Sequence, residues 1–307
     1  MSEAAVLLCG HGSRDPDAIE EFEQAAASLR ARLQGRDFAT GYLEFVRPTI
    51  GEALTELHAR GAGRILAIPG MLFAASHVKN DLPWEMNSFM ASHPGADVRL
   101  ARDLGIDAKL LEAAAERIAA VAPQRERSDS LLVVVGRGTN DPDANANIAK
   151  VARMLWEGLG FGWAETAFSG VAHPRVGAAL DRAARLGFRR IVVFPYFLFT
   201  GVLVKRIYAE TDNAAARFPE TAFVKAGYLR DHAKVVDAFL DRVDECDTGS
   251  PATNCQLCKY RTRIVGYDDS VGAPQQGHHH HVRGAGVGHH DDHGHAHPHA
   301  HGHHHGG

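Results

Sequence analysis

Apolar residues along the chain follow two alternating patterns. Short apolar runs bounded by Gly, Pro or Asp are typical of buried strands, whereas apolar residues that recur every three or four positions indicate the buried face of a helix. In the first half, strands are predicted at Val6 to Cys9, Thr40 to Phe45, Arg64 to Ile68 and Asp97 to Leu100. A helical stripe runs from Ile19 to Leu33, and further helices are expected to begin near Pro48, Pro83 and Asp107. This alternation predicts a parallel sheet covered by helices.

The same pattern occurs twice, because the sequence matches itself at an offset of 126 residues. Matched positions include Gly10 and Gly136, Asp15 and Asp141, Pro48 and Pro174, Pro69 and Pro195, and Lys79 and Lys205. Further on the offset becomes 125, which pairs Lys109 with Lys234. The predicted fold class is therefore α/β, with two tandem doubly wound domains, each built on a four-stranded parallel sheet.

The chain divides into four predicted segments. Residues 1–125 form the first lobe, and residues 126–245 form a second lobe that is a degenerate copy of the first. A Cys-containing linker follows at residues 246–271, and residues 272–307 form a tail rich in His and Gly. Because the tail lacks apolar periodicity, it cannot bury enough apolar surface to form a core, and we expect it to be disordered.

Composition and charge exclude several classes of function. The 307 residues are 45% hydrophobic and 23% charged, and the net charge is −4. This charge provides no basic surface for nucleic acid. The N-terminus lacks the basic and apolar regions of a signal peptide, and nowhere do about 18 apolar residues follow one another, as a membrane span would need. We expect a cytoplasmic protein that binds neither nucleic acid nor a membrane.

Three polar groups follow the predicted strands of the first half. His11 comes after the first strand, Glu44 lies at the end of the second, and His77 lies in the loop after the third. The carboxyl ends of parallel strands meet at one edge of the sheet, where α/β proteins bind their ligands. Imidazoles suit Co, Ni, Fe or Zn, and a carboxylate can accept protons. The pattern predicts a metal site at His11 and His77 with Glu44 as a catalytic group; an ion pair of Glu44 with Arg47 or Arg14 is the alternative.

The second copy has lost all three groups. Arg137, Gly170 and Leu203 stand at the positions of His11, Glu44 and His77. If these residues merely served the fold, a copy that preserves the fold should have kept some of them. We interpret this loss as one active centre in the first lobe, with the second lobe as a lid or binding wall.

Several short motifs make a family recognisable. They are Gly10 to Arg14, Leu43 to Phe45, Pro48 to Ile50, Pro69 to Leu72, His77 with Val78, and Asp81 to Pro83. In this order the motifs resemble the sirohydrochlorin cobaltochelatase family, in its long form with two fused lobes and a His-rich tail. The resemblance covers residues 4 to about 245.

The resemblance implies a class II chelatase that inserts Co²⁺ into sirohydrochlorin in cobalamin biosynthesis without a nucleotide. No phosphate-binding Gly-rich loop of the Walker type occurs in the sequence, which agrees with this. The metal ligands of the family match His11 and His77. Its substrate contacts match Arg47, Leu72, Phe73, Ala74, Ala75 and Ser76. Arg47 suits the carboxylates that rim sirohydrochlorin, and Glu44 or one of the histidines would accept the two pyrrole protons.

The linker and the tail carry further candidate metal ligands. Cys255 and Cys258 have a C-x-x-C spacing, and Cys246 precedes them. Similar long-form members carry an iron–sulfur cluster, so the resemblance implies one here; another metal or no cofactor are the alternatives, because three Cys do not complete a four-Cys set. Fourteen of the 20 histidines lie between His278 and His305. This composition suits loose binding of Co, Ni or Zn ions, for buffering or delivery of the metal.

Other functions remain open at this point. A sirohydrochlorin ferrochelatase or a nickel chelatase would use the same imidazoles, and the sequence does not distinguish the metals. From another class, a metal-storage protein or metallochaperone would explain the tail but not the loop from Leu72 to His77. A two-lobed small-molecule receptor would normally be exported. The sequence also leaves open whether the chain forms a homodimer.

Overall fold

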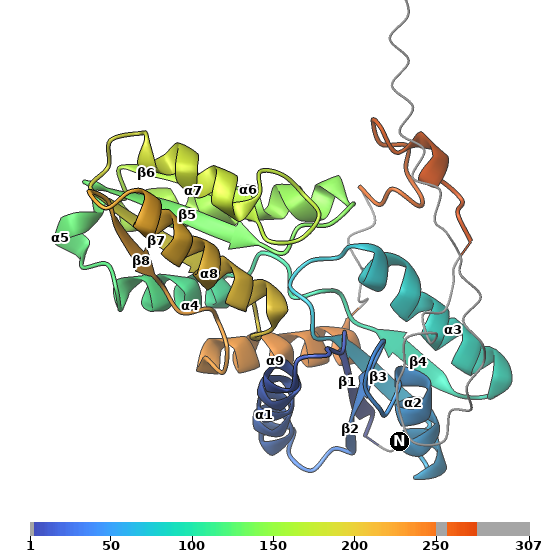
Figure 1. Cartoon of the computed structure of the whole chain (residues 1–307). Helices are drawn as coiled ribbons and strands as arrows, with labels where there is room; N and C mark the ends of the chain where they lie inside the picture. The colour runs from blue at the N-terminus through green and yellow to red at the C-terminus, as the bar shows by residue number, and fades with distance from the viewer. Residues whose placement is uncertain (1–2, 250–256, 275–307) are drawn as a thin grey trace, which may run out of the picture.

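The computed structural model of the chain describes residues 3–249 and 257–274. These residues form two four-stranded sheets, with strand orders β2-β1-β3-β4 and β6-β5-β7-β8, and every pairing is parallel (Figure 1). The strands of the first sheet are β1 (Ala5–Gly10), β2 (Phe38–Tyr42), β3 (Arg64–Pro69) and β4 (Asp97–Leu100). Those of the second are β5 (Ser130–Gly136), β6 (Trp163–Phe168), β7 (Arg190–Pro195) and β8 (Ala222–Lys225). The prediction of two tandem doubly wound domains is confirmed.

Helices follow the strands in both halves. In the first half they are α1 (Pro16–Arg32), α2 (Ile50–Ala59), a π-helical turn (His77–Asp81), α3 (Leu82–Ser92), α4 (Ala108–Ala119) and α5 (Gln124–Arg127). In the second half they are α6 (Pro142–Leu159), α7 (Val176–Ala184), α8 (Val202–Arg217) and α9 (Ala233–Thr248), and a short 3₁₀ turn follows at Asp268–Ser270. Within the described ranges, no helix is long and apolar enough to span a bilayer.

Two predicted boundaries are wrong, and both lie between β2 and α2. The strand predicted to reach Phe45 ends at Tyr42, because the next residues bend over the loop after β1, where Phe45 has a φ of 66°. The helix predicted to begin near Pro48 begins at Ile50, since Thr49 caps it in a reciprocal capping box with Glu52. Pro48 itself follows a cis peptide bond, as does Pro174 in the second half.

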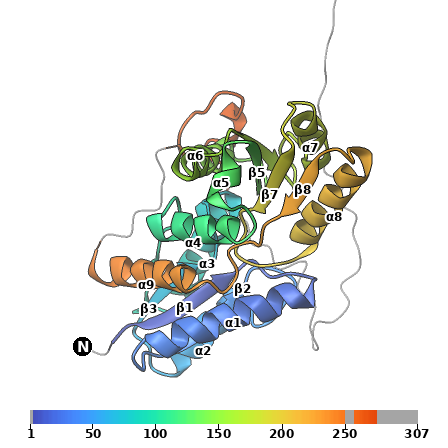
Figure 2. The ribbon, with the colours of Figure 1, turned by 90° about the vertical axis from the view of Figure 1, so that its left-hand side faces the viewer.

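The last long helix of each half packs in the other lobe. Helix α4 follows β4 of the first sheet but contacts α6 of the second lobe, whereas α9 follows β8 and contacts β3 and α1 of the first lobe (Figures 1 and 2). The two helices also contact each other, and one buried apolar cluster continues through both lobes. The division at residue 125 therefore describes the two copies in the sequence and remains a prediction, because in space the lobes have exchanged a helix.

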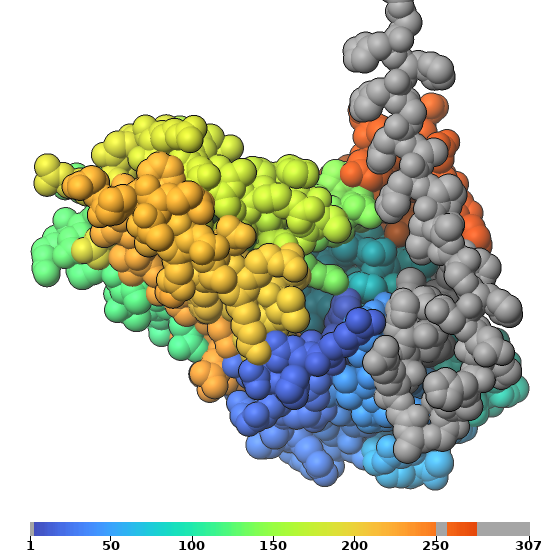
Figure 3. Space-filling view, in the orientation of Figure 1, coloured from blue at the N-terminus to red at the C-terminus, as the bar shows by residue number. Residues whose placement is uncertain are grey.

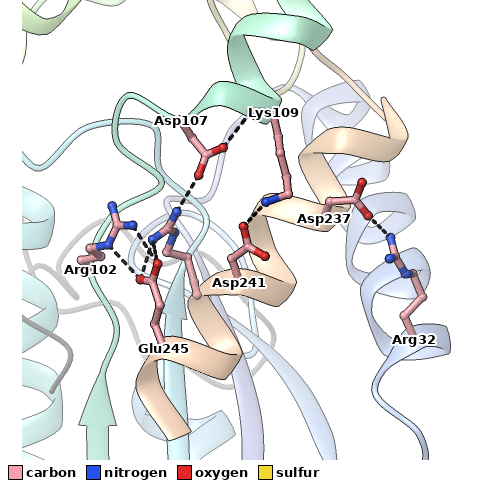
Figure 4. Close-up of polar contacts among 8 residues, drawn as sticks. Arg32, Arg102, Asp107, Lys109, Asp237, Asp241 and Glu245 are labelled. Atoms are coloured by element: carbon pink, nitrogen blue, oxygen red, sulfur yellow. Dashed lines mark hydrogen bonds and ion pairs between the residues drawn. The ribbon is translucent and has the colours of Figure 1, made fainter. Parts of the chain in front are cut away.

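Ion pairs accompany this exchange along one face of α9. Figure 4 shows Arg32 bound to Asp237 at 2.6 Å and Arg102 bound to Glu245 at 2.8 Å. Between them, the buried Arg242 reaches Asp107, the N-cap of α4, at 2.7 Å. All of these pairs join residues far apart in sequence, so they help to fix α9 in the first lobe.

Two lysines at equivalent positions of the repeat form further ion pairs between the lobes. Lys79 of the π-helical turn binds Asp141 at 2.9 Å and Asp143 at 3.2 Å. Its counterpart Lys205 binds the counterparts of these residues, Asp15 at 2.7 Å and Asp17 at 2.8 Å. We call them the Lys79 clamp and the Lys205 clamp. The Lys79 side chain is 0% exposed, whereas that of Lys205 is 52% exposed.

Candidate active site

A cavity of about 630 Å³ lies between the lobes, at the carboxyl ends of both sheets. The first lobe contributes the loops after β1 and β3, and the second contributes the loops after β5 and β7. The space-filling view shows the blue first lobe and the yellow second lobe meeting around a recess (Figure 3). The cavity therefore lies where open α/β sheets bind ligands, and both copies form its walls.

His11 and His77 are brought together at this cavity. They follow β1 and β3, which are neighbours in the sheet, so residues 66 positions apart in sequence leave the same edge. Their ring centroids lie 4.5 Å apart, with the ring planes perpendicular at 90°. Both line the cavity. Their placement is that of two side chains that could bind one ion, although the metal role predicted for them remains a prediction.

The tautomer of His11 follows from its hydrogen bonds. Nδ1 lies 2.9 Å from the carbonyl oxygen of Gly12, which can only accept, so Nδ1 carries the proton. Nε2 therefore carries the lone pair, and it lies 3.1 Å from the guanidinium NH2 group of Arg137. Burial, together with the nearby His77 and Arg137, lowers the pKa of His11 to about 3. The imidazole is thus neutral, as a metal ligand must be.

His77 is oriented in the same way by a carboxylate. Its Nδ1 lies 2.6 Å from Oδ2 of Asp81, one turn later, and the Asp81 side chain is only 1% exposed. The contact assigns the proton to Nδ1 and leaves the lone pair on Nε2. A histidine that donates from one nitrogen to a carboxylate or carbonyl is the usual arrangement around a protein-bound metal, because it fixes the ring and strengthens the other nitrogen as a ligand.

A buried carboxylate, that of Asp103, fixes the loop at residues 72–76 that is predicted to contact the substrate. Oδ2 of this buried carboxylate accepts the N–H of Ala74 at 3.0 Å, and burial raises the pKa of Asp103 to about 6. Leu72, Phe73 and Ala75 line the cavity, whereas Ala74 and Ser76 are not among its lining residues. The loop thus presents three of the five predicted residues directly to a ligand.

Glu44 and Arg47 lie outside the lining of the cavity. Glu44 is buried at 8% exposure, and its backbone N–H donates to the carbonyl oxygen of His11 at 3.0 Å. Arg47 is 42% exposed and forms an ion pair with Glu52 at 2.5 Å. The alternative partner considered for Glu44, Arg14, stacks over the Phe45 ring at 4.9 Å from its centroid. The roles predicted for Glu44 and Arg47 remain predictions.

Charge in the cavity comes from two arginines that the sequence reasoning missed. Arg14 and Arg137 line it, whereas the lining residues within the described part of the chain include no Asp, Glu or Lys. The remaining walls are largely apolar and aromatic, with Phe22, Phe45, Phe73, Tyr196, Phe197 and Phe199. A signal for Arg14 was present, since it ends the Gly10 to Arg14 motif. Arg137 was noticed only as the replacement of a histidine.

The cysteines do not form one cluster in the described residues. Cys246 lies at the end of α9, with Sγ 3.6 Å from the carbonyl oxygen of Arg99, and Cys258 lies 4.0 Å from Arg261. Cys9 is buried in the core of the first sheet. No group of three or more His, Cys, Asp or Glu that could hold a metal occurs in residues 3–249 and 257–274. Cys255 and the His-rich tail lie outside these residues, so their predicted metals remain predictions.

Fold and cavity together define a two-lobed α/β protein that can hold a large ligand between its lobes, beside a pair of histidines. The chain belongs to the CbiX family. The model of this family matches residues 5–121 and again residues 131–246, once for each copy of the repeat. The match confirms the resemblance found in the sequence motifs.

Similar proteins bear names with two different metals. A sirohydrochlorin cobaltochelatase of Priestia megaterium is 32% identical over 268 residues, which are 86% of this chain and 87% of that protein. A sirohydrochlorin ferrochelatase of the same organism is 28% identical over 74% of this chain and 85% of its own length. The structure of SirB from Bacillus subtilis with Fe³⁺ superposes with a TM-score of 0.72 at 26% identity, covering 80% of this chain and 96% of SirB.

Proposed function

We propose that this protein inserts Co²⁺ into sirohydrochlorin without a nucleotide, as a step of cobalamin biosynthesis. The observation that carries the proposal is the cavity that His11 and His77 line together with apolar walls and two arginines. The names of the relatives support sirohydrochlorin as the substrate, and cobalt occurs in the name of the relative at 32% identity. The choice of cobalt over iron or nickel is the more specific part of the proposal.

The cavity suits a flat apolar ligand with an anionic rim. Sirohydrochlorin is a tetrapyrrole ring with carboxylate side chains, and its faces can pack on aromatic residues such as Phe73 and Phe199. Arg14 and Arg137 can each grip a carboxylate with two parallel hydrogen bonds. Because no acidic residue lines the cavity among the described residues, a polyanion meets no repulsion there. Arg47 would add a third cation from outside the lining.

In the proposed reaction, His11 and His77 hold the metal ion above the ring through their Nε2 atoms. Asp81 makes His77 the stronger ligand, because a carboxylate that accepts the Nδ1–H increases the electron density on the ring. His11 donates to a neutral carbonyl and lies beside a cation, so it is the weaker ligand and the first to let the metal pass to the pyrrole nitrogens.

Insertion releases two protons from the pyrrole nitrogens, and a base must accept them. Glu44 is the proposed base, because its backbone adjoins that of His11. As Glu44 does not line the cavity, its protons would arrive through a water or through a histidine. Glu44→Gln is expected to reduce the maximal rate while leaving Co²⁺ binding in place.

The decisive test follows absorbance while sirohydrochlorin is mixed with Co²⁺, Fe²⁺ or Ni²⁺ and the full-length protein. We expect the fastest insertion with Co²⁺, and loss of insertion in His11→Ala and His77→Ala. His58→Gln, on a helix away from the cavity, serves as the matched control and keeps the wild-type rate. Retained turnover in both site variants would refute the proposed metal ligands. If none of the three metals is inserted, only a binding function would be left.

The other proposed metal sites lie outside this reaction. The tail with its fourteen histidines, 278 to 305, is proposed to buffer or deliver the ion, so removing the residues after Gly272 should leave insertion at saturating metal intact. A metal-storage protein or metallochaperone is the second candidate, favoured by the tail alone. A cluster at Cys255 and Cys258 stays a prediction, and no step of the mechanism uses it.

A further inference from the structure

Arg137 donates a hydrogen bond to Nε2 of His11, the nitrogen that would bind a metal ion. Its NH2 group lies 3.1 Å from Nε2, and Nδ1 is committed to the carbonyl oxygen of Gly12. A nitrogen lone pair that accepts a hydrogen bond cannot bind a metal ion at the same time. The Nε2 atom of His11 is therefore blocked by a side chain of the second lobe.

The guanidinium of Arg137 faces the cavity, where it can bind a carboxylate of a ligand. It lines the cavity from the loop after β5, where its NH2 group contacts the neutral imidazole of His11. Such a cation gains more from a carboxylate than from a neutral imidazole, because charge-assisted hydrogen bonds are about twice as strong as neutral ones.

We propose that Arg137 couples substrate binding to metal binding: a carboxylate of the tetrapyrrole draws the guanidinium away from His11 and thereby opens Nε2 to the metal. This inference rests on the proposed function and adds a positioning residue to it. The metal site of the free protein is kept closed by its own second lobe. The ion then binds firmly only where the macrocycle that receives it is already present.

The coupling must be reciprocal. If a bound carboxylate raises the affinity for the metal by some factor, a bound metal raises the affinity for the carboxylate by the same factor. Replacing Arg137 with an uncharged side chain of similar length should therefore act in two opposite directions. Metal should bind His11 more tightly in the absence of substrate, and sirohydrochlorin should bind more weakly.

The first measurement is a Co²⁺ titration of four full-length proteins without tetrapyrrole, followed by the ligand-field absorption of bound Co²⁺ in a metal buffer. The proteins are wild type, His11→Ala, Arg137→Met and the double variant. Binding to the His-rich tail is the same in all four and cancels in each difference. Between the wild type and His11→Ala, we expect only a small difference in Co²⁺ affinity. Between Arg137→Met and the double variant, we expect the protein that keeps His11 to bind Co²⁺ about tenfold or more tightly.

The second measurement is the rate of insertion against sirohydrochlorin concentration at saturating Co²⁺. Arg137→Met is expected to raise KM about tenfold or more, and Arg137→Lys less, because lysine keeps the charge but lacks the planar fork. Arg153→Met, on the exposed side of α6, is the matched control and changes neither quantity.

The two measurements separate the possible failures. Equal His11-dependent affinity in the two pairs would overturn the proposal that Arg137 blocks the metal. An unchanged KM in Arg137→Met would overturn the role of the substrate carboxylate. If the wild type inserts no metal at all, the proposed function fails, yet the titration without tetrapyrrole still decides whether Arg137 closes the site. Circular dichroism of each variant, compared with the wild type, verifies folding.

Discussion

At the scale of residues, the two histidines are oriented alike but by unequal partners. Gly12 offers His11 a neutral carbonyl oxygen, whereas Asp81 offers His77 a buried carboxylate. In addition, His11 faces Arg137, and its pKa is lowered to about 3. A pair of equal ligands would hold an ion without a preferred direction of transfer. An unequal pair can hold the ion on one side and release it on the other.

Asp81→Asn tests this inequality. The amide oxygen can still accept the Nδ1–H of His77, so the ring keeps its orientation, but the negative charge is lost. We expect Co²⁺ to bind about 10- to 100-fold more weakly, as is common when such a partner of a metal-bound histidine is changed. The KM for Co²⁺ should rise accordingly, while the KM for sirohydrochlorin stays close to the wild-type value. An equal rise in both constants would indicate a general distortion of the site instead.

At the scale of elements, the strands β3 and β4 and the starts of α3 and α4 follow the pattern of the sequence closely. They are marked by local signals: an apolar run, a proline in the first helical turn, or an aspartate N-cap. The end of β2 was predicted too late because Leu43 is buried like a strand residue and still donates its N–H to Gly10 of β1, whereas the N–H of Glu44 donates to His11 in the loop after β1. Periodicity reports burial and does not report the path of the backbone.

The candidate site could be predicted only on one side. His11 and His77 were found because the ends of neighbouring parallel strands must meet, which is a property of one sheet. Arg137, Tyr196 and Phe199 come from the second sheet, and their approach depends on how the lobes pack. Nothing local in the sequence encodes that packing. Relative to the first copy, position 137 has lost an imidazole and gained a guanidinium that reaches His11 across the cavity.

The loop after β1 depends on a glycine that supports both the fold and the site. Gly12 has a φ of 85°, and a Cβ atom there would lie 1.8 Å from the carbonyl oxygen of Glu44. Gly12→Ala should therefore lower the free energy of unfolding by several kcal/mol and displace His11. Gly61→Ala is the matched control, since Gly61 has a φ of 95° but no atom within 4 Å of the new Cβ.

Thermal or urea denaturation measures the stability of both variants, and the Co²⁺ assay measures the site. Gly61→Ala should cost only the roughly 1–2 kcal/mol of a left-handed backbone and keep full activity. Comparable losses of stability in the two variants would show that the contact with Glu44 contributes nothing.

At the scale of the whole molecule, the lobes are joined by clamps of equal chemistry and unequal burial. In the Lys79 clamp the lysine and Asp141 are both buried, so the charges are screened little by solvent. In the Lys205 clamp the lysine is half exposed, and water and salt can replace its partners. The lobes should therefore stay joined at Lys79 and separate first at Lys205, which makes that side the expected entrance to the cleft.

Lys79→Met and Lys205→Met compare the two clamps directly. Removing Lys79 leaves two carboxylates without their cation in a buried place, which typically costs about 3–5 kcal/mol. Removing Lys205 should cost about 1 kcal/mol or less, as exposed pairs usually do. Denaturation at low and high salt provides the measurement: the difference in stability between the wild type and Lys205→Met should shrink at high salt, whereas the loss in Lys79→Met should persist. A larger loss in Lys205→Met than in Lys79→Met would contradict the assignment of the entrance.

The contact between His11 and Arg137 also determines how many sites the two copies can form. These residues hold the same position in the two copies of the repeat, and they touch each other. Equivalent positions can meet only where the axis that relates the copies passes between them. A site on such an axis is shared by both copies and is not multiplied by them. The two copies thus form one chamber with two unlike halves, and for the proposed function we expect one macrocycle and one ion for each polypeptide.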